Sequence, residues 1–180
     1  MENMSRSGSD RAVFGPFDER EYRRVLGHLP TGVCVITSIA ADGTAVGLAV
    51  GSFTSASLNP PLVAFFPDMS SSSWPRIERT GRFCANILAQ DQQAVCRRFA
   101  RKGTDKFDGL AYSLSPLGSP IVEHMAAWVD CTIEQVLRVG DHFLVTGRVH
   151  SLGTQRSGQP LVFLQGSYGG FISLADCQAE

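Results

Sequence analysis

The 180-residue sequence predicts a mainly β protein with a few helices, folded as one antiparallel barrel. The first observation is a series of short, β-branched apolar runs, each bounded by Gly, Pro, Asp or Ser. The second is that few helices separate these runs, whereas a parallel sheet needs a crossover after nearly every strand. The third is Asp42-Gly43 between two runs, because this pair tolerates the positive φ angles of a tight hairpin turn.

The first element is expected to be a short amphipathic helix over residues 17–29. Apolar side chains recur there at helical spacing, the acidic pair Asp18-Glu19 opens the first turn, and Pro30 follows the end. Two more helices are expected, and both would cover ends of the barrel. They span residues 72–80 and residues 91–99, the second with Asp91 as its N-cap.

The strands are expected in the remaining apolar runs. They are residues 33–38, 45–53, 62–66, 82–87, 127–138, 141–152 and 160–171. The domain is expected to span residues 15–173. Residues 1–14 are polar and lack periodicity, so they are expected to form a flexible tail, with a second tail at residues 174–180.

Composition argues against several function classes. Sixteen basic and seventeen acidic residues nearly cancel and are scattered, which leaves no basic patch for nucleic acid or an anionic membrane. The apolar runs are too short to cross a bilayer and the polar start carries no signal sequence, so a cytoplasmic protein is expected. With 43% hydrophobic and only 18% charged residues, a homo-oligomer that covers some apolar surface is expected.

Cysteine and histidine spacing gives no indication of a metal site. The cysteines lack a CxxC pair and a histidine at ligand spacing, so they are expected to be reduced and to behave as small hydrophobes. They are Cys34, Cys84, Cys96, Cys131 and Cys177. The four histidines are far apart and are treated as structural, except His142, which follows a turn between two strands and could reach the mouth of a pocket.

Two clusters of small polar residues are candidate ligand sites. Residues 51–61 are too long for a simple turn, and their hydroxyls and free N–H groups suit an oxygen-rich group such as phosphate. Residues 70–75 place four serines before a helix, where they could cap it or help to bind an anion. An ordinary polar loop and simple capping explain the two clusters equally well. Glycine-rich dinucleotide, P-loop and nucleophile-elbow motifs are all missing from the sequence.

Five segments in order resemble the flavin reductase-like family, the small reductase components of two-component flavin monooxygenases. The segments are residues 30–37, 52–63, 83–88, 140–142 and 168–171. The likeness extends over about residues 17–171. It implies an FMN-binding split β-barrel of antiparallel Greek-key type and a homodimer with sites near the subunit interface.

The resemblance also implies an activity, that of an NAD(P)H:flavin oxidoreductase. FMN or FAD would be reduced by NADH or NADPH and released, by diffusion, to a separate monooxygenase or halogenase. No catalytic side-chain acid or nucleophile is expected, because hydride passes directly between the two cofactors. Two alternatives remain: an oxidase of the same architecture with tightly bound FMN, and a non-enzymatic flavin- or haem-binding protein.

Site residues follow from the resemblance position by position. Those expected at the flavin are Thr31, Gly32, Val33, Ala49, Val50, Gly51, Ser52, Ser55, Ser57, Ser72, Ser73, Trp74, Asn86, Ile87, Leu88, Gln93, Phe99 and Lys106. His142 and Tyr168 would face the nicotinamide. Family members often carry Thr at position 49 and Asn or Ser at position 51, so Ala49 and Gly51 predict a site that depends more on backbone donors.

Overall fold

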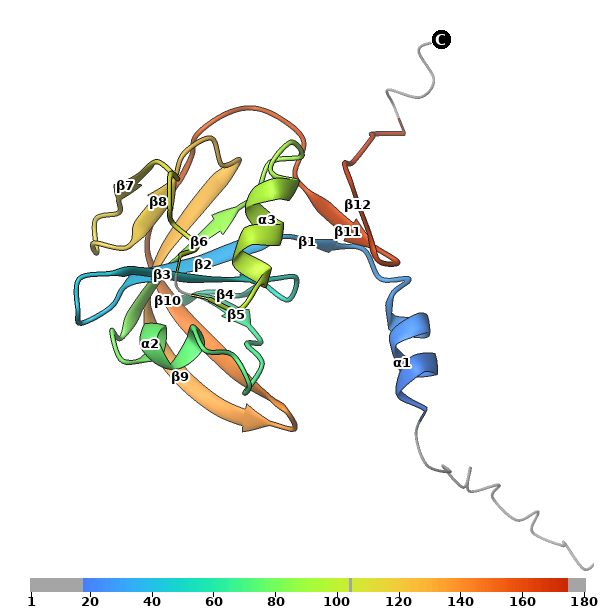
Figure 1. The fold of residues 1–180 in the computed structure, drawn as a ribbon, viewed down its shortest axis with the longest axis horizontal. Helices are drawn as coiled ribbons and strands as arrows, with labels where there is room; N and C mark the ends of the chain where they lie inside the picture. Colours follow the sequence, from blue (N-terminus) through green and yellow to red (C-terminus); the bar gives the residue numbers. More distant parts are fainter. Residues whose placement is uncertain (1–17, 104, 175–180) are drawn as a thin grey trace, which may run out of the picture.

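The computed structural model describes residues 18–103 and 105–174 and is mainly β (Figure 1). The expected tail at residues 1–14 and nearly all of that at 174–180 lie outside the described residues. The helices are α1 (Glu19–Leu26), α2 (Trp74–Glu78) and α3 (Gln93–Ala100). The strands are β1 (Thr31–Gly32), β2 (Cys34–Ile39), β3 (Ala45–Val50), β4 (Thr54–Leu58), β5 (Pro61–Phe65), β6 (Arg82–Ile87), β7 (Tyr112–Leu114), β8 (Pro120–Val122), β9 (Ala127–Val139), β10 (His142–Thr154), β11 (Val162–Leu164) and β12 (Ser167–Gly169).

Seven strands form the main sheet, in the order β3-β2-β6-β9-β10-β5-β4. Each neighbouring pair is antiparallel, as the sequence predicts. The order is not sequential, because β6 pairs with β2 and β5 pairs with β10, which fits the expected Greek-key type. Two small sheets, β1-β11-β12 and β7-β8, flank the barrel (Figure 1).

The predicted hairpin turn at Asp42-Gly43 is confirmed between β2 and β3. Gly43 has a φ of 80°, which is unfavourable for other residue types. The Asp42 carboxylate accepts hydrogen bonds from the backbone N–H and the hydroxyl of Thr44, at 3.0 and 2.6 Å. It also pairs with Arg76 of α2 at 3.0 Å, so the turn is connected to the helix over the barrel end.

Two apolar clusters hold the fold together. In the barrel interior the Phe65 ring meets Trp74 and Phe83 edge to face, with centroids 5.7 and 5.1 Å apart. A second cluster, which includes Leu88 and Phe99, lies outside the barrel wall between β2 and α3. Since β2 contributes side chains to both clusters, it is buried on both faces, which explains why its first three residues, 34–36, are all apolar rather than alternating.

No strand was expected between residues 53 and 62, but residues 54–58 form strand β4, so the interpretation of this segment as a polar loop was wrong. This strand pairs with β5 but lies at the edge of the sheet, and most of its side chains are exposed. An edge strand with two solvated faces carries no apolar alternation, so its Ser and Thr residues suggested a loop.

Three other expectations required correction. Residues 160–171 form a hairpin rather than one strand, because Gln165 and Gly166 adopt positive φ angles of 49° and 80°. The three-residue strands β7 and β8 were not expected, being too short for a periodic pattern. The N-cap of α3 is Gln92 rather than Asp91, whose carboxylate binds Arg156 instead.

The cysteines inside the described ranges are free and buried, as expected for small hydrophobes. They are Cys34, Cys84, Cys96 and Cys131, and Cys177 lies outside the described residues. Burial raises the pKa of Cys34 to about 12, so its reactive thiolate form is disfavoured.

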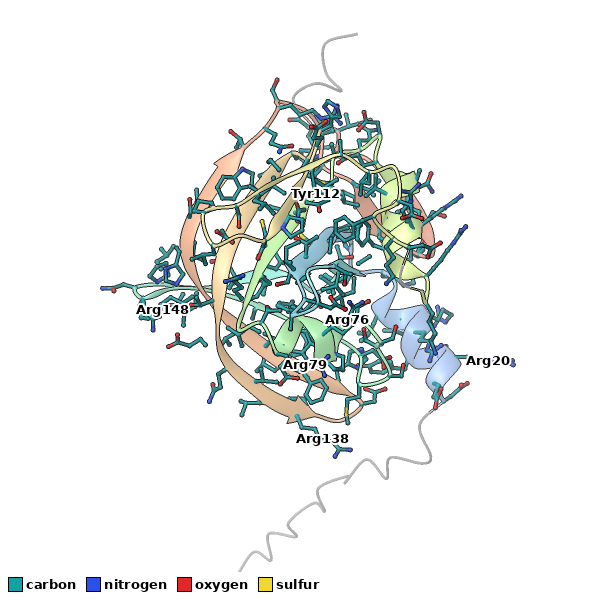
Figure 2. All side chains as sticks on the ribbon, turned by 60° about the vertical axis from the view of Figure 1, so that its left-hand side comes forward. Arg20, Arg76, Arg79, Tyr112, Arg138 and Arg148 are labelled. Carbon is teal, nitrogen blue, oxygen red and sulfur yellow. The ribbon has the colours of Figure 1, made fainter. Side chains whose placement is uncertain are left out.

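Charged side chains are distributed around the molecule. Figure 2 shows Arg20, Arg138 and Arg148 on different sides of the structure rather than on one face. Within residues 18–103 and 105–174, no helix is both long and apolar enough to cross a membrane.

Candidate functional site

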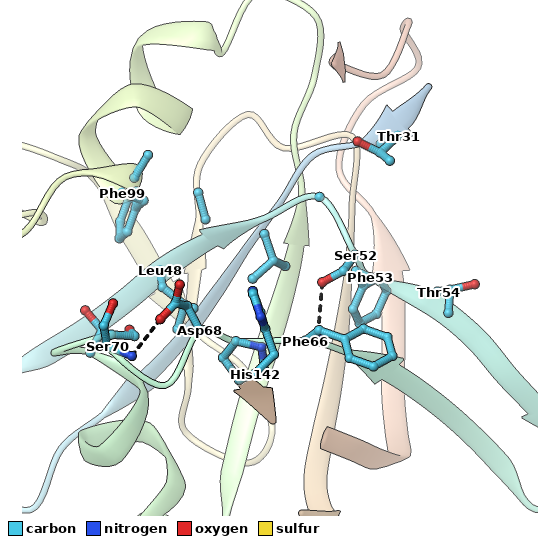
Figure 3. Close-up of a pocket in the computed structure, with 18 of the residues that line it drawn as sticks. Thr31, Leu48, Ser52, Phe53, Thr54, Phe66, Asp68, Ser70, Phe99 and His142 are labelled. Atoms are coloured by element: carbon cyan, nitrogen blue, oxygen red, sulfur yellow. Dashed lines mark hydrogen bonds between the residues drawn. The ribbon is translucent and has the colours of Figure 1, made fainter. Parts of the chain in front are cut away.

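A cavity of about 1220 Å³ opens at the end of β3 (Figure 3). Its walls come from α1 and the link to β1, residues 48–54, most of residues 66–73, the end of α3 with Lys106, and from Val139 and His142. Ligand pockets commonly measure roughly 300–1,000 Å³. The cavity is therefore large enough for a ligand of cofactor size.

One wall of the cavity consists largely of backbone. Ala49 and Val50 end β3 there and Gly51 follows, and the small Ala49 and bare Gly51 let a flat ligand approach the main chain closely. Ser52 follows, and its hydroxyl oxygen accepts a hydrogen bond at 2.9 Å from the N–H of Phe66 (Figure 3). This bond fixes the wall against the end of β5, and the Ser52 O–H remains able to donate.

Lys106 places a buried positive charge beside this wall. It is 7% exposed, and its ammonium group donates three hydrogen bonds of 3.1 Å, to the carbonyls of Gly47 and Phe99 and to the hydroxyl of Ser73. All three acceptors are neutral, and no ion pair joins Lys106 to a carboxylate within the described ranges. Burial lowers the pKa of Lys106 because it disfavours the charged form. An anion bound in the cavity would compensate that charge.

The serines before α2 have different roles. Ser73 occupies the N-cap position without a side-chain capping bond, and its oxygen accepts from Lys106 instead. The hydroxyl of Ser71 accepts the N–H of Trp74 at 3.2 Å. Ser70 and Ser72 also line the cavity, so the cluster contributes both structural contacts and hydroxyls to the ligand space.

His142 enters the cavity from the side opposite α3 (Figure 3). Its Nδ1 lies 2.7 Å from Oδ1 of Asp141, which orients the ring and leaves Nε2 available to a ligand. Asp68 lies beside it, and the backbone N–H of Ser70 donates to this carboxylate at 2.6 Å. That bond is the main cause of a lowered pKa for Asp68, with smaller contributions from His142 and Lys102.

The structure brings eleven of the twenty expected site residues to the cavity. They are Thr31, Gly32, Ala49, Val50, Gly51, Ser52, Ser72, Ser73, Phe99, Lys106 and His142. The other nine do not line it. They are Val33, Ser55, Ser57, Trp74, Asn86, Ile87, Leu88, Gln93 and Tyr168.

Several of these nine residues have structural contacts that account for their position. Trp74 is buried in the barrel core. The amide nitrogen of Asn86 donates to the carbonyl of Val35 at 3.1 Å, and its oxygen accepts the N–H of Val122 at 2.9 Å. These bonds join β2, β6 and β8 rather than facing the cavity.

Tyr168 likewise makes a contact outside the cavity. Its hydroxyl lies 3.2 Å from the sulfur of Cys96, so it connects β12 to α3. This hydrogen bond, followed by burial, raises the pKa of Tyr168 to about 12. A role of Tyr168 at the nicotinamide remains a prediction that the cavity does not support.

The sequence did not reveal part of the lining. Asp68 was missed because it lies in the link between a strand and the serine cluster, without a motif of its own. Arg101 and Lys102 line the rim, and the basic residues at the end of α3 were the signal that could have identified them. Tyr22 and Leu26 were assigned to an amphipathic helix, but their place at the cavity depends on where α1 lies.

Comparison with known proteins shows a family match over most of the chain. Residues 26–171 match the model described as "Flavin reductase like domain". A flavin reductase of Pseudomonas putida is 54% identical over 162 residues, which cover 90% of this chain and 95% of that protein. HsaB of Rhodococcus jostii, the reductase subunit of a flavin-dependent monooxygenase, is 48% identical over 93% of this chain and 86% of that protein.

Solved structures agree with these matches. The NADH:FAD oxidoreductase SgcE6 of Streptomyces globisporus, solved with NAD and FAD fragments, superposes with a TM-score of 0.82 at 30% identity. The match covers 88% of this chain and 96% of that one. Together with the antiparallel sheets, the structural matches confirm the predicted split β-barrel.

Proposed function

Because the chain belongs to the flavin reductase-like family, we propose that its cavity binds a flavin and that the protein reduces this flavin with NADH or NADPH. The observation that carries the proposal is Lys106, a buried ammonium group whose acceptors are all neutral. A flavin phosphate would supply the missing negative charge. Ser72, on the same side of the cavity, offers a hydroxyl to the phosphate oxygens.

The remaining walls suit the other parts of a flavin. The small Ala49 and the bare Gly51 leave the main chain open to a planar ring, and backbone N–H groups near Gly51 can stabilise charge on its polar edge. We therefore expect FMN or FAD to bind more tightly than riboflavin, which lacks a phosphate. The cavity volume of about 1220 Å³ leaves room for a nicotinamide beside the ring.

The protein's contribution to catalysis would be positioning. A bound flavin supplies the hydride acceptor, and the chain has to hold the nicotinamide against it and keep water out. His142, oriented by Asp141, is the side chain proposed to position the nicotinamide nucleotide. Phe53 and Phe99 would exclude water from the two sides of the ring.

We also propose a homodimer and a partner enzyme. The dimer is supported by α1, which has no buried residue although Val25 and Leu26 give it an apolar face. The partner is supported by relatives that are reductase subunits of monooxygenases, such as HsaB, and the structural neighbour BorF belongs to a two-component halogenase. Reduced flavin would reach such a partner by diffusion.

The proposal is tested by anaerobic stopped-flow mixing. The protein is mixed with NADH or NADPH and with FMN, FAD or riboflavin, and loss of the oxidised-flavin absorbance is followed. We expect bleaching with many turnovers of added flavin and the lowest KM for a phosphorylated flavin. This design identifies activity, donor and acceptor together.

The alternatives give different results in the same experiment. A protein that stays yellow after gel filtration and does not turn over free flavin would be an oxidase with tightly bound FMN. A protein that quenches flavin fluorescence but never oxidises NADH or NADPH would be a binding module. Either result would overturn the proposed reductase activity.

A further inference from the structure

Thr31 and Gly51 face each other at the edge of the cavity. Thr31 belongs to β1, Gly51 directly follows β3, and both line the cavity. A Cβ atom added to Gly51 would lie 2.9 Å from Oγ1 of Thr31 and 3.7 Å from its Cβ. The first distance is shorter than normal packing allows. A side chain at position 51 and the Thr31 hydroxyl therefore compete for one space.

The Thr31 hydroxyl has no hydrogen-bond partner within residues 18–103 and 105–174. Its backbone is held by the pairing of β1 with β11, where Thr31 lies opposite Phe163. Because Thr is branched at Cβ, only a few χ1 rotamers are open to it. Figure 3 shows Thr31 at the side of the cavity near Ser52, whose own oxygen is already bonded to Phe66.

We infer that Thr31 and Gly51 act as a pair, in which the bare glycine keeps the Thr31 hydroxyl in the cavity as a hydrogen-bonding group for the flavin. The ligand class is a planar heterocycle with carbonyl and N–H groups on its edge. A hydroxyl suits this edge because it both donates and accepts. The inference rests on the proposed function, since it assigns a contact within the same flavin site.

The pair makes a prediction that neither residue makes alone. Gly51→Ser places a second hydroxyl in the occupied space and pushes Thr31 out of position, so flavin affinity should fall. Thr31→Val removes the hydroxyl at nearly constant shape and should also weaken binding. In Thr31→Ala/Gly51→Ser the space is free again, so the new serine should restore affinity.

The measurement is FMN titration by quenching of flavin fluorescence, with melting temperature as the folding control. Thr31→Val, Thr31→Ala and Gly51→Ser should each raise the FMN Kd about three- to tenfold, which is the range that one hydrogen bond supplies, and Thr31→Ala is the single variant that closes the double-mutant cycle. Thr31→Ser should stay within about twofold of wild type, and the double variant should bind more tightly than Gly51→Ser alone. Thr154→Val, at the exposed end of β10, is the matched substitution away from the cavity.

Kinetics supply a second measurement. The contact would form in the ground state and in the transition state alike, so Thr31→Val should raise the KM for flavin and leave kcat unchanged. If Gly51→Ser does not fold, Thr31→Val and Thr31→Ser still decide the role of the hydroxyl.

Two outcomes would overturn the inference that Thr31 and Gly51 act as a pair. One is a Thr31→Val protein that binds FMN within twofold of wild type, and the other is a cycle in which the two single effects simply add. If the wild-type protein binds and reduces flavin but the Thr31/Gly51 mutant cycle is additive, only this inference is refuted and the proposed function stands. Wild-type protein that binds no flavin would refute both the inference and the proposed function.

Discussion

At the scale of single residues, Lys106 connects the fold to the proposed chemistry. Its ammonium group joins β3, the start of α2 and the end of α3 through neutral acceptors. A buried charge is costly unless something compensates it. The same residue therefore stabilises the wall of the cavity and prepares it for an anion.

Replacement of Lys106 by Met should selectively weaken binding of phosphorylated flavin. Loss of the buried positive charge, which compensates the phosphate, predicts an increase in FMN Kd of about tenfold or more, with riboflavin changed by less than about threefold. Fluorescence titration of both flavins measures this difference. Lys102→Met, at the exposed rim, is the control and should have the smaller effect. Equal losses for FMN and riboflavin would show that Lys106 only supports the fold.

The pH dependence of binding follows from the lowered pKa of Lys106. Its folded pKa lies below the unfolded value, so between the two the unfolded chain holds more protons and stability rises with pH. Phosphate affinity has the opposite trend, because only the protonated amine compensates the anion. The ratio of FMN to riboflavin affinity should fall as pH rises from 7 towards 10, and Lys106→Met should abolish this trend. A ratio that is constant with pH would contradict the assignment.

His142→Ala should affect the nicotinamide rather than the flavin. The ring enters the cavity and is oriented by Asp141, so its loss should raise the KM for NADH or slow flavin reduction about five- to tenfold, which corresponds to about 1 kcal/mol. Stopped-flow reduction and flavin titration separate the two effects. His150→Ala is the control, because the His150 ring is hydrogen-bonded to the Thr132 hydroxyl at 2.9 Å, at an exposed part of the β9–β10 pair. Unchanged kinetics for His142→Ala would exclude a role in positioning.

At the scale of elements, two packing contacts depend on glycines in the sheet. A Cβ on Gly147 of β10 would lie 2.5 Å from the Phe83 ring and 3.2 Å from Cβ of Cys131. A Cβ on Gly47 of β3 would lie 2.7 Å from the Phe99 ring. Aromatic rings from other elements thus fill the space over both strands, which fixes how the sheet packs against them.

Gly147→Ala should destabilise the barrel by about 1–3 kcal/mol, because overpacking forces the Phe83 ring and the strand to move. Chemical denaturation measures the change. Gly169→Ala in β12 is the matched control, since a Cβ there meets nothing within 4 Å. If both variants unfold at the same denaturant concentration as wild type, the close packing has no energetic consequence.

Element predictions succeeded where a strand is long or buried on both sides. The β2–β3 hairpin and the long pair β9–β10 carry clear apolar patterns and a Gly in each turn. β4 failed because its polar edge position removes that pattern, and β7–β8 failed because three residues show no period. Whether such short or edge strands form depends on the neighbouring strands with which they pair, and the sequence of the strand itself does not show this.

At the scale of the whole molecule, α1 is exposed on its apolar side. It lies apart from the barrel in Figure 1, and Val25, Leu26 and Leu29 are 50–67% exposed. An exposed apolar stripe of this kind is typical of an interface. The helix also lines the cavity, so a dimer formed here would place the site near the second subunit.

Val25→Glu should shift the protein from dimer to monomer, because it places a charge in the centre of that apolar stripe. Light scattering after size-exclusion chromatography measures the mass. Val25 does not line the cavity. Arg20→Glu is the charge control, because Arg20 lies five positions before Val25 and so about 140° away around the helix. A wild-type monomer, or a Val25→Glu dimer of unchanged affinity, would place the interface elsewhere or rule it out.

The family resemblance predicted part of the candidate site, both in short segments and at isolated positions. Residues 49–52 and 72–73 were expected at the flavin and line the cavity, as do Lys106 and His142. Asn86 and Trp74 were also expected there, but their side chains bond or pack inside the fold. A match of motifs predicts that a segment lies near the site. It does not predict whether a given side chain of that segment points into the cavity, because this depends on how the strands pair.

The sequence by itself determined the antiparallel barrel, because its short apolar runs follow one another with too few helices for the crossovers that parallel strands need, and its ordered motifs identified the family. Only the tertiary structure decided which of the expected residues line the cavity and which atoms of them meet. Lys106 and Ser73 meet there from different elements, as do Thr31 and Gly51, and no spacing in the sequence encodes these contacts. The physical reason is that contacts between distant segments depend on the register and packing of the completed sheet.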